Sequence, residues 1–84
     1  MAASRQDIKR WLIEGKEENQ RFVIVVCDTF DYGDYPVYCK DVQEAKESYK
    51  KHNGVHMQRI MEIYDLEIPI DEQLKETKAW HIAW

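Results

Sequence analysis

The feature that most constrains the fold is an uninterrupted apolar run, Phe22-Val-Ile-Val-Val-Cys27. The run does not alternate apolar with polar residues, and it is rich in β-branched side chains. This pattern is typical of a strand that is covered on both faces. Acidic and tyrosine-rich residues follow it, and Gly33 supplies the positive φ that a tight turn needs. The sequence therefore predicts a central strand over about 21–30 that opens a hairpin.

The second strand of the hairpin is expected over about 35–40. Pro36 cannot donate a backbone hydrogen bond, and this favours an edge position for that strand. A two-residue turn at Tyr32-Gly33 would place Phe30 opposite Tyr35 in the ladder. In that register the two cysteines of the chain lie on opposite sides of the sheet and cannot form a disulfide.

Two helices are expected to flank the hairpin. Ser4 can cap a first helix, which Gly15 is expected to end. Asp41 and Glu44 have the spacing of a capping box for a second helix over 42–52. Asn53-Gly54 is expected to end this helix with a left-handed turn.

The remaining segments complete a small α+β domain. Residues 55–66 fit either a helix or a strand, and we favour a strand over about 59–67, because a sheet of two strands alone is marginal. A short helix over 72–78 and an extended, docked tail over 79–84 are expected to follow.

The predicted fold class is a single α+β domain over 1–84, with elements in the order α-β-β-α-β-α and a three-stranded sheet in the order 2-1-3. The helices are expected on one face of that sheet. Its other face would then need cover from the aromatic tail or from a second subunit.

Composition narrows the possible functions. The net charge of −4 disfavours non-specific binding to nucleic acid or to an anionic membrane, and no apolar stretch is long enough to span a bilayer. The polar beginning of the chain lacks the apolar segment of a signal peptide, so we expect a cytoplasmic protein with reduced thiols.

No phosphate loop, Gly-x-Ser-x-Gly or Cys-x-x-Cys motif is present, and we expect neither a metal nor a cofactor. The sequence favours a binding protein over an enzyme. A small acid/base enzyme that uses Asp28 and a histidine remains an alternative.

Three groups of residues are candidates for function. The acidic turn is the candidate partner-binding site, although Asp also simply favours turns. Its residues are Asp28, Asp31, Tyr32, Asp34 and Tyr35. A basic stretch around Asn53-Gly54 is the candidate site for an anionic, nucleotide-like ligand, with a solvated helix face as the alternative. Its residues are Lys50, His52, Asn53, His56 and Arg59, joined by Tyr64 for stacking.

The third group is aromatic. We expect Trp11, Trp80 and Trp84 either to line an interface between copies of the chain or to pack in its core. Small chains without disulfides or metals often gain stability by forming oligomers, and this favours a homodimer or a higher homo-oligomer.

The stretch from Val25 to Tyr38, VVCDTFDYGDYPVY, resembles a motif in a group of small proteins of bacteria and their phages. The helix start at 7–15 and the run over 53–66 resemble the same group, so the similarity spans most of the chain. The resemblance implies no particular activity, but it implies a phage or prophage origin. Small acidic phage proteins often inhibit or sequester components of host defence, and by analogy this chain would act in the cytoplasm of a bacterial host.

Two functional hypotheses follow. In the first, a homo-oligomer sequesters an anionic, nucleotide-like signal of host defence at a subunit interface. In the second, the acidic turn binds a basic surface of a host protein and inhibits it.

Overall fold

A computed structural model describes residues 4–30, 33–54, 57–76 and 79–81. The elements follow in the order α1 (Arg5–Glu17), β1 (Phe22–Asp28), β2 (Gly33–Cys39), α2 (Val42–His52), β3 (Gln58–Asp65) and α3 (Ile70–Leu74). The predicted α-β-β-α-β-α order and α+β class are confirmed. Asp31, Tyr32, His56 and Trp84 lie outside the described residues, so the predictions made for them stay predictions.

The sheet has the predicted strand order β2-β1-β3, and β1 pairs antiparallel with both of its neighbours. The two outer strands are therefore parallel to each other, and α2 connects them. Pro36 lies in the edge strand β2, as expected of a residue without an amide hydrogen.

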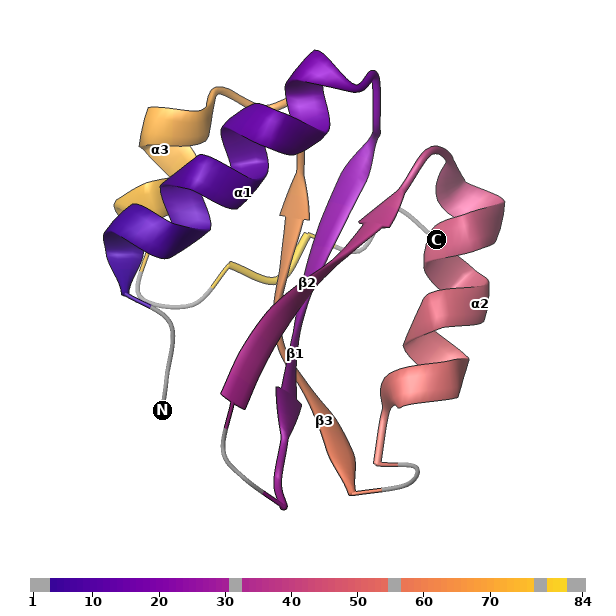
Figure 1. Ribbon diagram of the computed structural model, residues 1–84. Coiled ribbons are helices and arrows are strands. Elements are labelled where there is room, and N and C mark those ends of the chain that lie inside the picture. Colours follow the sequence, from indigo (N-terminus) through magenta and orange to yellow (C-terminus); the bar gives the residue numbers. More distant parts are fainter. Residues whose placement is uncertain (1–3, 31–32, 55–56, 77–78, 82–84) are drawn as a thin grey trace.

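The expectation that all helices share one face of the sheet is wrong. Helices α1 and α3 cover one face and α2 covers the other (Figure 1). Val23 and Val25 point toward α1, whereas Ile24 and Val26 point toward α2. Because α2 already covers the second face, β1 is buried on both sides without help from a second subunit.

The starts of α1 and α2 agree with the capping predictions. Ser4 Oγ accepts a hydrogen bond from Asp7 N at 3.1 Å, and Ser4 N donates to the Asp7 carboxylate at 3.2 Å. In α2 the Asp41 carboxylate accepts from Glu44 N at 2.9 Å. The Glu44 carboxylate accepts from Lys40 N rather than from Asp41 N, so the second box differs in this bond.

Two helix boundaries differ from the predictions. Gly15 does not end α1, because it lies inside the helix and is buried against Tyr38 and Leu66. Helix α3 begins at Ile70 rather than near 72 and ends at Leu74. Pro69 precedes its first residue, where the missing amide hydrogen costs nothing.

The chain after α3 docks along β3. Ala79 O accepts from Ile63 N at 2.9 Å, and His81 N donates to Ile63 O at 3.0 Å. Trp80 thereby forms a parallel bridge with Ile63. The predicted extended, docked conformation is confirmed for residues 79–81, and these residues cover the outer edge of β3.

Gly15 gives the first testable prediction. A Cβ at this position would lie 3.0 Å from Tyr38 Cδ1 and 3.1 Å from Leu66 Cδ1, which is tighter than ordinary van der Waals contact. We expect Gly15→Val to lower the free energy of unfolding by about 1–3 kcal/mol, because the helix must move away from the sheet. Urea denaturation measures this change. Glu17→Val, at an exposed position of the same helix, should cost no more than about 0.7 kcal/mol.

Candidate functional site

The β1–β2 hairpin differs from the prediction in its register, and the difference shapes the candidate site. Cys27 pairs with Asp34 and Asp28 with Gly33, a shift of four residues from the predicted pairing of Phe30 with Tyr35. Strand β1 stops early because the Asp28 carboxylate accepts a hydrogen bond from Phe30 N at 2.9 Å. This is an Asx turn, in which an aspartate side chain accepts a hydrogen bond from the backbone N–H two residues later, so this N–H does not pair with a neighbouring strand.

The shorter strand releases Phe30 from the sheet. Instead of pairing with Tyr35, Phe30 lies in the loop beyond β1, and 77% of it is exposed. A large aromatic side chain with this exposure at the end of a hairpin is the most prominent apolar feature of the described surface. The predicted register hid this feature, although the Asp28-Thr29-Phe30 sequence carried the signal of an Asx turn.

Met57 lies beside this loop. Thr29 N and Thr29 Oγ1 both donate to Met57 O, each at 2.7 Å, so the loop after β1 is tied to the residue before β3. Met57 is 58% exposed and has a φ of 62°, a left-handed conformation that is unusual for a long, unbranched side chain. The loop after β1 and the loop before β3 lie at the same end of the sheet (Figure 1), and each carries one exposed large apolar residue.

A polar bridge supports this end on the side of α2. Gln58 Nε2 donates to the Tyr35 hydroxyl at 2.6 Å, and Gln58 Oε1 lies 2.8 Å from His52 Nδ1. In this arrangement Nδ1 carries a proton, because an amide oxygen only accepts. The rings of Tyr35 and His52 also meet edge to face, with centroids 6.3 Å apart. Gln58 therefore joins β2, β3 and the last turn of α2.

Carboxylates border the same end of the sheet. Burial and the nearby Asp28 carboxylate raise the pKa of Tyr35, so its hydroxyl stays protonated at neutral pH. On the opposite face, Cys27 pairs with both Asp34 and Arg59. Burial and a hydrogen bond to Asp34 raise the pKa of the Cys27 thiol, which makes it a poor nucleophile.

We call this region the hairpin-end surface. It consists of Asp28, Phe30, Asp34, Tyr35 and Met57. Three of these residues belong to the predicted partner-binding group and lie at one end of the sheet, Asp28 and Tyr35 on the α2 face and Asp34 on the other face. Phe30 and Met57 were not predicted as site residues. For Phe30 the only sequence signal was the Asx turn at Asp28, and no pattern in the sequence indicated that Met57 would be exposed, because both exposures depend on where the strands end.

The predicted anion-binding group does not form one cluster. His52 and Asn53 lie at the end of α2 next to Gln58, but Arg59 points to the other face of the sheet, opposite Cys27. Lys50 is exposed in the last turn of α2, where a cation complements the negative end of the helix dipole. The positive charge of Lys50 therefore has a role in stabilising α2.

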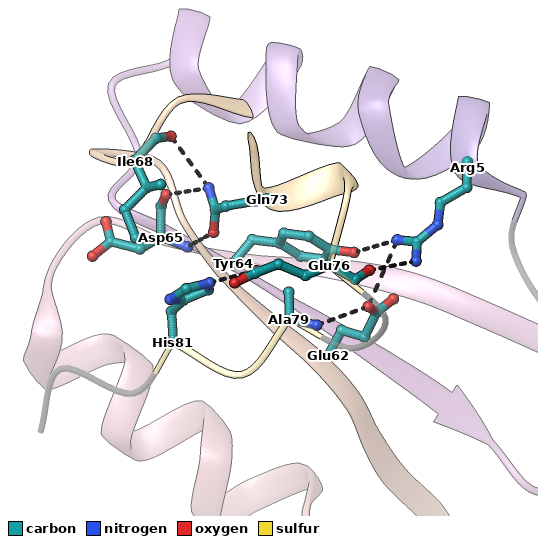
Figure 2. A network of polar contacts seen from close by, with 9 residues as sticks. All are labelled: Arg5, Glu62, Tyr64, Asp65, Ile68, Gln73, Glu76, Ala79 and His81. Carbon is teal, nitrogen blue, oxygen red and sulfur yellow. Dashed lines mark hydrogen bonds and ion pairs between the residues drawn. The ribbon is translucent and has the colours of Figure 1, made fainter. Parts of the chain in front are cut away.

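Tyr64 lies far from the other members of that group. It is fully buried in the core under α1, and its hydroxyl accepts a hydrogen bond from Arg5 at 3.3 Å (Figure 2). Arg5 also donates to Glu76 O at 2.8 Å and lies 3.8 Å from the Glu62 carboxylate. Tyr64 cannot stack on a ligand in this position, and it serves instead to hold α1 and the chain after α3 against β3.

The two tryptophans that the structure describes, Trp11 and Trp80, pack within the chain. Trp11 packs against the core under α1, and Trp80 meets Tyr49 of α2 edge to face, with centroids 6.3 Å apart. Trp80 is still exposed over about two fifths of its surface. A role of these tryptophans at an interface between copies of the chain remains a prediction. The contacts of Trp11 agree with the alternative prediction that it packs in the core.

A cleft of about 780 Å³ lies at the opposite end of the sheet. Lys16, Arg21 and Lys40 line it. Arg21 is already bound to Asp65 at 3.1 Å and to Glu67 at 3.3 Å, and Lys40 lies 3.8 Å from Glu44. Because neighbouring carboxylates neutralise two of its three cations, this cleft has little excess positive charge for an anionic ligand.

Within the described ranges no group of three or more His, Cys, Asp or Glu residues could hold a metal ion. In that same part of the chain no helix has the length and apolar character that crossing a membrane requires. Comparisons with family models, with curated proteins and with solved structures found no match.

Gln58 gives a prediction about the site. We expect Gln58→Leu to lower the free energy of unfolding by about 1–2 kcal/mol, because the half-buried Tyr35 and His52 each lose a hydrogen-bond partner. Urea denaturation measures the loss. Gln43→Leu, on the exposed surface of α2, is the matched control and should change stability by less than about 0.5 kcal/mol.

Tyr64 gives a prediction about pH. Burial raises the pKa of its hydroxyl well above the usual value, so the folded protein keeps this proton after the unfolded chain has lost it. Stability should therefore fall as pH rises above about 10, with this residue contributing up to about 1.4 kcal/mol per pH unit. Thermal unfolding between pH 8 and 11 measures the slope. Tyr64→Phe should flatten it, and an unchanged slope in this variant would refute the assignment.

Proposed function

We propose that this chain is a binding protein whose contact surface is the hairpin-end surface, and that its target is a protein with an apolar recess bordered by basic side chains. The observation that carries the proposal is the 77% exposure of Phe30 at the tip of a hairpin that the rest of the structure holds in place. Aromatic side chains that enter a partner's pocket often contribute most of the energy of an interface.

The charges around Phe30 support a basic partner. Asp28 accepts a hydrogen bond from Phe30 N, Asp34 lies at the same end of the sheet, and Asp31 follows Phe30 in the sequence. The whole chain carries a net charge of −4. Carboxylates at the rim of an apolar contact increase the association rate with a positively charged surface and reject acidic surfaces. The resemblance to phage proteins is consistent with a target in a bacterial host and with an inhibitory role.

The arrangement of contacts favours this proposal over the two alternatives. Sequestration of a nucleotide-like anion has less support, because Arg59 lies on the other face from His52 and Asn53. The end of α2 is also the negative end of its dipole, which repels an anion. An acid/base enzyme has less support, because the Asp28 carboxylate accepts from Phe30 N and so shapes the loop.

Site-specific crosslinking tests the proposal. Phe30 is replaced by p-benzoylphenylalanine, a photoreactive amino acid that keeps the aromatic ring, and the protein is irradiated in its native cells. We expect one dominant crosslinked protein, which is identified by mass spectrometry. The same amino acid at Ile13, an exposed apolar residue on α1, is the control and should not capture this protein. Equal capture from both positions would contradict the proposal.

The captured protein is then purified for binding measurements. We expect Phe30→Ser to weaken the Kd by about 30-fold or more, the effect of losing about 2 kcal/mol at an interface centre. Asp28→Asn combined with Asp34→Asn should mainly slow association and reduce its salt dependence. If Lys50→Glu with Arg59→Glu abolishes function and the aspartate variants do not, the anion-binding hypothesis is the better one.

A further inference from the structure

We propose that Met57 is the second apolar anchor of the hairpin-end surface. Its left-handed conformation lowers the stability of the fold, and it is retained because binding needs the methionine side chain at this position. This inference rests on the proposed function and specifies its partner. The partner's recess must accept two large apolar side chains from neighbouring loops, one aromatic and one flexible, with basic groups around it.

The backbone of Met57 is the first observation. Among the described residues other than glycine, only Asn19 and Met57 have a positive φ, 60° and 62°. Asn adopts this region readily because its short side chain can form local hydrogen bonds, whereas a long side chain such as that of Met does so rarely. Gly or Asn would therefore be the favourable choice for folding at position 57.

The surroundings hold this unfavourable conformation firmly. Met57 O accepts two hydrogen bonds from Thr29, and Gly54 N donates to Gln58 O at 2.9 Å, which closes the loop that precedes Met57. The next side chain, Gln58, is bound to both Tyr35 and His52. A strained residue persists only where its neighbours fix it, and such residues concentrate at functional sites.

The Met57 side chain does not pack in the core of the folded chain. Met57 is 58% exposed, and it belongs to neither of the two groups of buried apolar residues. Met57 O is bonded to Thr29, the residue that directly precedes Phe30, so Met57 and Phe30 lie in loops that contact each other. Methionine also suits this role, because its flexible thioether adapts to the shape of a partner's surface.

A reciprocal pair of substitutions tests the stability half of the inference. We expect Met57→Asn to raise Tm by about 4 °C, because Asn tolerates the left-handed conformation. Asn19→Met places methionine at the other positive φ, far from the hairpin-end surface, and should lower Tm by a similar amount. A fall of Tm in Met57→Asn would show that the side chain stabilises the fold, and it would overturn the inference.

The binding half uses the protein that crosslinks through position 30 as its probe, in purified form. We expect Met57→Asn to weaken its Kd about 10-fold, whereas Asn19→Met should leave the Kd unchanged. An unchanged Kd for Met57→Asn would overturn the inference while the proposed function stands. If position 30 captures no protein at all, the proposed function fails and this inference fails with it, whatever the Tm values are.

Discussion

The burial of β1 on both faces is the constraint on which the rest of the structure depends. Because its side chains are apolar on both sides, each face needs a cover, and because it is central, each edge needs a partner. Helices α1 and α3 provide the first cover and α2 the second. The connection from β2 through α2 to β3 follows, since α2 must cross the sheet to reach the far edge of β1.

The same arrangement covers both faces of the sheet and leaves its two ends accessible. Residues 79–81 cover the outer edge of β3, and Pro36 interrupts the donors of the β2 edge. At one end, the Arg21–Asp65 ion pair joins the start of β1 to the end of β3. The buried Gln73 of α3 satisfies both backbone groups of Asp65 and so ties α3 to β3. At the other end, the loops carry the exposed apolar side chains and the strained backbone.

The polar contacts divide the molecule in a similar way. Arg5 joins α1, β3 and the chain after α3. This network is structural, since the Tyr64 hydroxyl and the Glu62 carboxylate both bind Arg5 within the chain. The bridge from Tyr35 through Gln58 to His52 is smaller and lies directly behind the hairpin-end surface. It keeps two loops at a fixed separation, which a surface with two anchors requires.

Local patterns of apolar residues, proline and capping side chains were enough to predict the order of the elements, the central and edge strands and the starts of α1 and α2. The predicted placement of Cys27 and Cys39 on opposite faces of the sheet is also correct, although the predicted register was wrong by four residues. A shift by an even number of residues keeps every side chain on the same face. Only the tertiary structure decided that α2 covers the second face, that Gly15 allows close packing inside α1, and that Tyr64 is buried. It alone decided the exposure of Phe30 and Met57, because that depends on where β1 stops and on hydrogen bonds between loops 28 residues apart in the chain.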